Sequence, residues 1–149
     1  MSVSASVSTP VRRVLDTNIV LDLWVFEEPQ AEALRTSLET GSTQWLATAA
    51  MREELARVLA YPQIAKRLTH RQLSASAVLG HFDRWAQLQP DAPKAPYACK
   101  DPDDQKFIDL ATAHTAALHS KDAQVLCMKK RLERCGVTLN PCVTAFDAV

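Results

Sequence analysis

Apolar and polar positions along the chain form short apolar runs separated by longer segments with helical spacing. Short apolar or β-branched runs are typical of buried strands, and strands are expected at residues 11–15, 44–48, 85–89, 117–120 and 136–139. Helices are expected in the segments at residues 29–40, 49–60, 70–83, 103–116 and 123–134. This alternation predicts an α/β fold, a three-layer α/β/α sandwich with a central parallel five-stranded sheet.

Residues that break helices bound several of these elements. Gly41 follows the first predicted helix, and Tyr61-Pro62 is expected to end the second. The proline-rich segment at residues 89–102 is expected to be a loop. The apolar run "IVLDLWVF" after Asn18 is hydrophobic on more than one face, so it could pack inside the chain or against a second subunit.

Length and composition narrow the class of protein. The chain has 149 residues, enough for a flexible tail at residues 1–10 and a single domain at residues 11–149. It has no apolar stretch near the length of about 18 residues that spans a membrane, and no signal peptide pattern at its start. The lack of a long apolar stretch predicts a protein without a membrane partner. The four cysteines form no CxxC pair, which favours reduced thiols in a cytoplasmic protein. Seventeen basic and 17 acidic residues balance, so nucleic acid binding would need local basic patches.

Two aspartates come at the ends of predicted strands. Asp16 follows the first strand, and Asp122 lies just past the fourth. Ligand sites of open parallel sheets form outside the carboxyl ends of the strands, so both side chains are expected at one edge of the sheet. Taken singly, each could instead be an ordinary turn or helix-capping residue.

Helical phase selects two further acids. Glu53 lies nearly opposite the apolar side of its helix, whereas Glu54 flanks that side and can reach toward the strand ends. In the helix at residues 103–116, Asp109 is expected to face water and Asp104 lies beside the apolar stripe. Glu54 and Asp104 are therefore the better candidates, although an acid in a first helical turn also favours the helix dipole.

Four candidate acids are thus expected at one edge of the sheet: Asp16, Glu54, Asp104 and Asp122. Close carboxylates repel one another and raise one another's pKa unless a cation neutralises them. Oxygen ligands without Cys or His favour hard ions such as Mg²⁺ or Mn²⁺. Because such ions bind phosphate oxygens and lower the pKa of bound water, the four acids predict metal-assisted phosphodiester hydrolysis.

Four motifs in this chain resemble those of one protein family. "VLDTNIV", "EEL..VL..P", "DPDDQKFIDLA" and "SKD" occur in the order and context of PIN-domain ribonucleases, especially the bacterial toxin components of toxin–antitoxin pairs. The resemblance implies a parallel five-stranded sheet, dependence on Mg²⁺ or Mn²⁺, and endonucleolytic cleavage of single-stranded RNA. The family's catalytic, metal-binding acids then correspond to Asp16, Glu54, Asp104 and Asp122.

The same resemblance assigns supporting residues and partners. Asn18 and Ser120 correspond to the family's polar helpers, and Ser120 keeps the hydroxyl of the threonine that many members have. Asp101 belongs to the "DPDD" pattern and either contacts the metal or only caps the helix, and Asp103 has the same two roles open to it. The resemblance also implies a homodimer and a cognate antitoxin that occupies the active-site groove.

Lys121 adjoins Asp122, so it is expected to contact the RNA backbone, while His114 lies on the apolar side of its helix and is expected in the core. Two other functions compete with the nuclease. A haloacid-dehalogenase-like phosphatase would use Asp16 as its nucleophile, but that chemistry wants a second aspartate where this chain has Asn18. A catalytically degenerate fold that binds RNA or protein would have no need for four mutually repelling acids.

Overall fold

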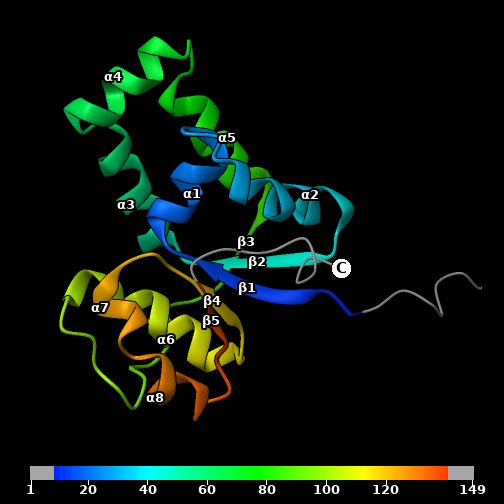
Figure 1. Ribbon diagram of the computed structural model, residues 1–149, viewed down its shortest axis with the longest axis vertical. Helices are drawn as coiled ribbons and strands as arrows, with labels where there is room; N and C mark the ends of the chain where they lie inside the picture. Colours follow the sequence, from blue (N-terminus) through cyan, green and yellow to red (C-terminus); the bar gives the residue numbers. More distant parts are fainter. Residues whose placement is uncertain (1–8, 141–149) are drawn as a thin grey trace, which may run out of the picture.

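The computed structural model describes residues 9–140 of the chain, and a parallel sheet is at its centre (Figure 1). The strands are β1 (Val11–Leu15), β2 (Thr43–Ala47), β3 (Ala86–Leu88), β4 (Ala117–His119) and β5 (Leu139–Asn140). Their order is β3-β2-β1-β4-β5, and every pairing is parallel. The predicted α/β fold with a five-stranded parallel sheet is therefore confirmed.

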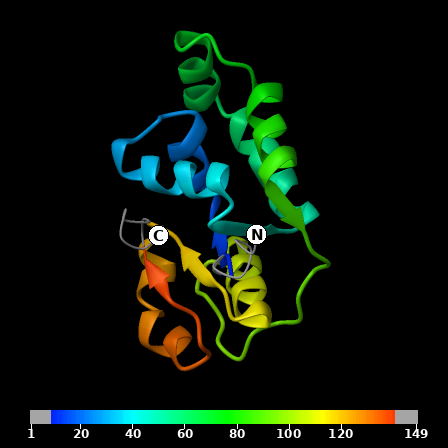
Figure 2. The same ribbon diagram turned by 90° about the vertical axis from the view of Figure 1, so that its right-hand side faces the viewer.

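Helices cover both faces of the sheet. They are α1 (Thr17–Trp24), α2 (Glu32–Thr40), α3 (Ala49–Leu59), α4 (Pro62–His70), α5 (Ala75–Trp85), α6 (Gln105–His114), α7 (Ala123–Leu126) and α8 (Lys129–Glu133), with 3₁₀ turns at Pro29–Ala31 and Pro102–Asp104. Figure 1 shows α1 and α2 on one side of the sheet and α6, α7 and α8 on the other. The helices α3, α4 and α5 extend away from the sheet, and α4 lies farthest from it (Figures 1 and 2). Among the described residues, no helix is long and apolar enough to cross a membrane.

The core explains why the strands are short and apolar. Strands of a parallel sheet are covered on both faces, and Val14, Trp45 and Leu118 from three adjacent strands are all buried. Trp45 stacks on Trp24 with ring centroids 5.7 Å apart and meets the edge of Phe82 at 5.0 Å. These contacts hold α1 and α5 against β2.

The apolar run after Asn18 packs inside the chain as α1. Seven of its eight residues are buried, and Asp16 caps the helix by accepting a hydrogen bond from the backbone N–H of Ile19 at 3.1 Å. No helix was predicted for this run because an apolar segment buried on several faces has no single stripe to reveal its period. Of the two alternatives for this run, packing inside the chain is therefore the one that the structure shows.

Proline and serine define two helices where one was predicted. Pro62 was expected only to stop the preceding helix, yet it occupies the first turn of α4, where its missing N–H costs nothing. Ser74 then caps α5, its hydroxyl oxygen accepting a bond from the N–H of Ala77 at 3.0 Å. The predicted helix at residues 70–83 is therefore wrong at its start, because the chain turns at Arg71 and begins again.

The last predicted elements also shift. The helix expected at residues 123–134 is divided into α7 and α8 at Cys127 and Met128. Among the described residues, the strand expected at residues 136–139 is found at Leu139–Asn140, the two residues that pair with β4. Most of the predicted tail at residues 1–10 lies outside the described part of the chain.

Candidate functional site

Asp16 lies at the carboxyl end of the central strand and is held from three sides. The parallel pairing of Leu15 with His119 places it next to Ser120, whose hydroxyl donates a bond of 2.5 Å to the second carboxylate oxygen. Asp16 is only 4% exposed, and burial raises its pKa, while the Ser120 hydroxyl and the N–H groups of Ile19 and Asn18 oppose that rise. Its carboxylate is therefore fixed in direction before any ligand arrives.

Asp122 lies beside Asp16 through the same serine. The backbone N–H of Asp122 donates to the Ser120 oxygen at 3.1 Å, and its own carboxylate caps α7 by accepting from Gln124 at 2.8 Å. The negative charge of Asp122 also raises the pKa of Asp16. Ser120, which is completely buried, thus connects the two aspartates that follow β1 and β4.

Asp101 and Asp104 complete a cluster with Asp122. One carboxylate oxygen from each of the three lies within 4.8 Å of the other two, close enough to hold one metal ion. Asp101 also caps the 3₁₀ turn, accepting a bond from the N–H of Asp103 at 3.0 Å. The structure therefore shows the capping role of Asp101 and places it in the cluster, so its contact with a metal stays a prediction, while Asp103 is exposed.

The pKa of Asp104 is raised by its burial and by the neighbouring carboxylates. Burial raises its pKa to about 7, helped by the charge of Asp122, the charge of Asp101, a hydrogen bond with Asp122 and the charge of Asp16. One of its carboxylate oxygens is buried and makes no hydrogen bond within the described structure. Within residues 9–140, no lysine, arginine or histidine forms an ion pair with any of these four aspartates. A divalent cation would supply what the buried oxygen lacks, and hard oxygen donors suit Mg²⁺ or Mn²⁺.

Glu54 is not one of the three clustered residues, and it has its own partners. One of its oxygens accepts a bond from the Thr17 hydroxyl, and the other pairs with the Lys106 ammonium at 2.5 Å. Lys106 also donates to the backbone oxygen of Asp103 at 2.6 Å. The structure therefore brings three of the four predicted acids close to one another and gives the fourth a lysine.

Asn18 and Lys121, two further predicted site residues, differ in their surroundings. Asn18 is exposed, directly after the first residue of α1. The Lys121 ammonium forms an ion pair of 2.5 Å with Asp22, whose side chain is 6% exposed. Contact of Lys121 with a substrate therefore stays a prediction, and it would compete with this ion pair.

Two predictions about single side chains are wrong. Asp109 does not simply face water, because it accepts bonds of 2.8 Å from the backbone N–H of Ala95 and from Gln105, and so holds the proline-rich loop. His114 is only half-buried, since α6 ends there and the apolar stripe stops. The buried histidine is His119, 1% exposed on β4.

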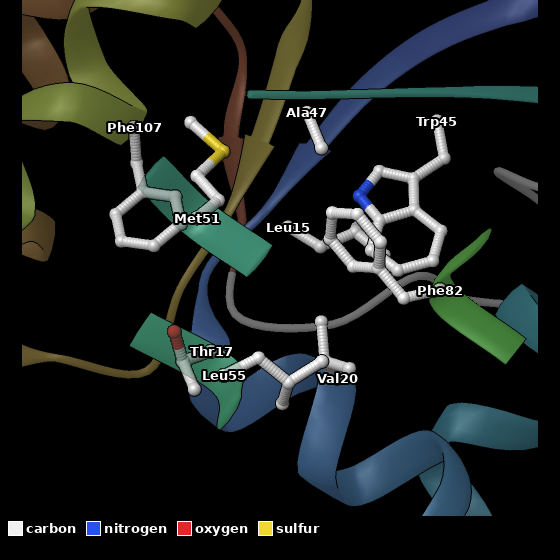
Figure 3. A pocket seen from close by; sticks show the side chains of 9 residues that line it. All are labelled: Leu15, Thr17, Val20, Trp45, Ala47, Met51, Leu55, Phe82 and Phe107. Atoms are coloured by element: carbon white, nitrogen blue, oxygen red, sulfur yellow. The ribbon is translucent and has the colours of Figure 1, made fainter. Parts of the chain in front are cut away.

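Thr17 and Lys106 contact the predicted site residue Glu54, although neither was itself predicted. Both stand inside quoted motifs, Thr17 directly after Asp16 and Lys106 two residues after Asp104. Thr17 also lines a small cavity of about 10 Å³, the lower limit for one water molecule, among apolar side chains that include Leu55 and Phe107 (Figure 3). Thr17, which donates to Glu54, therefore also contacts the edge of the apolar core.

Comparison with known proteins identifies the family. The profile of the PIN domain matches residues 12–123, which contain all four predicted acids. The chain belongs to the PIN domain family. Proteins of this family are generally nucleases.

A solved structure with the same fold is VapBC2 from Rickettsia felis, bound to a DNA fragment from their promoter. The match to one of its chains has a TM-score of 0.58 and 14% sequence identity, and it covers 87% of this PIN-domain chain and 98% of that one. No curated protein sequence gives a significant match.

Proposed function

We propose that this PIN-domain protein is a Mg²⁺- or Mn²⁺-dependent endoribonuclease that hydrolyses phosphodiester bonds of single-stranded RNA. The observation that carries the proposal is the aspartate cluster. Within residues 9–140, a buried Asp104 oxygen has no partner and no basic side chain forms an ion pair with the aspartates. Asp16, Asp101, Asp104 and Asp122 would hold the ion. When bound, the ion supplies Lewis acidity and a water of lowered pKa.

The chain's own residues prepare the site for that chemistry. Ser120 fixes the direction of Asp16, and the caps that Asp101 and Asp122 form with backbone N–H groups fix theirs. Groups locked by such bonds lose little further freedom when they bind a ligand, so the site is organised in advance. Asn18 is exposed beside Asp16 and is proposed to contact the RNA, and Lys121 is proposed to bind a phosphate when it leaves Asp22.

We further propose that the protein is the toxin of a toxin–antitoxin pair in the cytoplasm. Support comes from the fold of VapBC2 from Rickettsia felis, which was solved bound to a fragment of promoter DNA. The partners in this proposal are an RNA substrate and a cognate antitoxin protein, and the toxin itself forms a homodimer. Co-expression with candidate small proteins and co-purification would identify the antitoxin.

Cleavage of an unstructured RNA by the purified protein tests the enzymatic proposal. We expect cleavage with Mn²⁺ or Mg²⁺, none with chelator, and loss of activity in Asp16→Asn and Asp104→Asn. Asp83→Asn is the control because Asp83 is an exposed acid in an ion pair with Arg52, away from the cluster.

Four results would overturn the enzymatic proposal. Cleavage that persists in chelator, or that survives both substitutions, would exclude the metal-dependent site. RNA binding without cleavage in either metal would favour the catalytically degenerate fold. Release of phosphate from a small ester, lost in Asp16→Asn, would indicate a phosphatase.

A further inference from the structure

The ion pair of Glu54 and Lys106 has no role in the metal site proposed at the aspartates. The two residues come from α3 and α6, 52 positions apart in sequence, and their side chains are only 16% and 25% exposed. A pair this shielded from water is screened less than a surface pair. The fold therefore places one protein cation beside the acidic cluster and directs it at a single carboxylate.

Both oxygens of Glu54 are occupied by protein groups. The Thr17 hydroxyl bonds to one and the Lys106 ammonium to the other. Residues in two-metal sites use such a carboxylate as a ligand of the second ion, which lies about 4 Å from the first. Here the ammonium carries the compensating positive charge instead.

Lys106 is also anchored in a defined position. Its ammonium donates to the backbone oxygen of Asp103 at 2.6 Å and lies 5.0 Å from the centre of the Phe107 ring. An ammonium has three N–H groups, and the bonds to Glu54 and Asp103 use two of them within the described structure. The third N–H remains for an oxygen of a substrate phosphate.

We propose that Lys106 is the second cation of this site, neutralising Glu54 so that the protein binds a single divalent ion at the aspartates. This inference rests on the proposed function and deepens it. Lys106 is a positioning residue for Glu54 and offers its remaining N–H to the phosphate. Glu54 is then a partner of the lysine and not a ligand of the ion.

The number of bound Mn²⁺ ions, measured by electron paramagnetic resonance and calorimetry, tests the proposal. We expect one ion in the wild type and two in Lys106→Met, because Glu54 then gains a free oxygen next to the cluster. Lys106→Arg keeps the charge and should bind one. The matched control is Lys100→Met, which removes an exposed lysine next to Asp101 and should also leave one ion. Two ions in the wild type, or one in Lys106→Met, would overturn the inference.

Glu54→Gln provides a second variant that keeps the size of the side chain. If Glu54 serves only Lys106, the affinity for the first Mn²⁺ should change less than about threefold, whereas loss of a direct ligand should cost more than about tenfold. A loss of that size would overturn the inference.

Thermal unfolding supplies a readout that needs no RNA. With chelator, Lys106→Met should unfold at a lower temperature than the wild type, because Glu54 loses its counter-charge. Saturating Mn²⁺ should raise the unfolding temperature of Lys106→Met more than that of the wild type. The folded variant would bind two ions and the folded wild type one, and each ion that binds only the folded chain stabilises it. An equal or smaller rise in Lys106→Met would overturn the inference.

The same titration separates this inference from the proposed function. A wild type that binds no Mn²⁺, or an Asp104→Asn variant that binds it normally, would refute the metal site itself. If wild type and Lys106→Met each bind one ion and the aspartate variants bind none, the metal site stands and only the role of Lys106 is refuted.

Discussion

Carboxylates near the carboxyl ends of β1 and β4 fall into two groups that differ in their counter-charge. Glu54 and Asp22 are both largely buried, and each forms an ion pair of 2.5 Å with a lysine. Asp101, Asp104 and Asp122 are clustered, and no described basic side chain pairs with them. Buried charges need a partner, so folding satisfies the first group, while the second has no counter-charge among the described residues.

The comparison shows that paired and unpaired carboxylates lie near the same edge of the sheet. The lysines Lys106 and Lys121 offset the free-energy cost of burying the charges of Glu54 and Asp22. The clustered aspartates keep their repulsion, which appears as a raised pKa of Asp104. Removing a lysine charge from the first group should therefore lower the free energy of unfolding. Removing a carboxylate charge from the second group should leave that free energy unchanged or raise it.

Asp104→Asn should have the largest effect, because it removes the carboxylate at the centre of the unpaired group. We expect at least about a 100-fold loss of RNA cleavage, since residues that merely support metal ligands already contribute 10- to 100-fold. With chelator present, urea unfolding should show the variant to be as stable as the wild type or more stable, because repulsion is relieved. A variant that retains full cleavage, or is clearly less stable than the wild type in chelator, would contradict the comparison.

The pH dependence of stability sharpens the comparison. The carboxyl of Asp104 has an ordinary pKa of 3.8 and a folded value of about 7, so the folded protein holds a proton that the unfolded chain has released. Its contribution to stability is fully present below about pH 4 and is lost as the pH rises to about 7. Urea unfolding in chelator should show this fall in the wild type and a smaller fall in Asp104→Asn. A fall of equal size in both would contradict the assignment.

Lys121→Met breaks a lysine pair of the first group. Asp22 is 4% exposed as a residue and would lose its cation, so the free energy of unfolding should fall by about 1–3 kcal/mol. The double variant with Asp22→Asn should recover part of this loss because no unpaired charge remains. If Lys121 also contacts RNA, the variant should bind RNA more weakly. The slope of log affinity against log salt concentration should then fall by about one, as for the loss of one phosphate contact. Unchanged unfolding in both variants would show that the pair contributes nothing.

Ser120→Ala should have the smallest effect. It removes the bond of 2.5 Å to Asp16 and the acceptor for the Asp122 backbone, but it leaves every carboxylate in place. The affinity for Mn²⁺ should fall about tenfold, in the range for groups that orient metal ligands. Ser120→Thr keeps the hydroxyl and should stay close to the wild type. Equal losses in the alanine and threonine variants would show that packing, not the hydroxyl, matters at this position.

Much of the fold could be predicted from the sequence because its signals are local. The apolar runs predicted four of the strands to within about two residues, and Gly41 ends α2 in the left-handed conformation that glycine adopts easily. The errors come where local signals compete or are absent. The run that forms α1 shows no stripe, and Pro62 can stop one helix or start another.

The sequence by itself determined which carboxylates could gather, because Asp16 and Asp122 follow parallel strands and Asp104 lies at a helix start. Periodicity of two or 3.6 residues is a property of neighbouring positions and can be read along the chain. Only the tertiary structure decided that Lys106 pairs with Glu54, that Lys121 pairs with Asp22, and that Asp101 joins the cluster. Those contacts join distant segments, and they follow from how α1, α3 and α6 pack around the sheet, which no local pattern encodes.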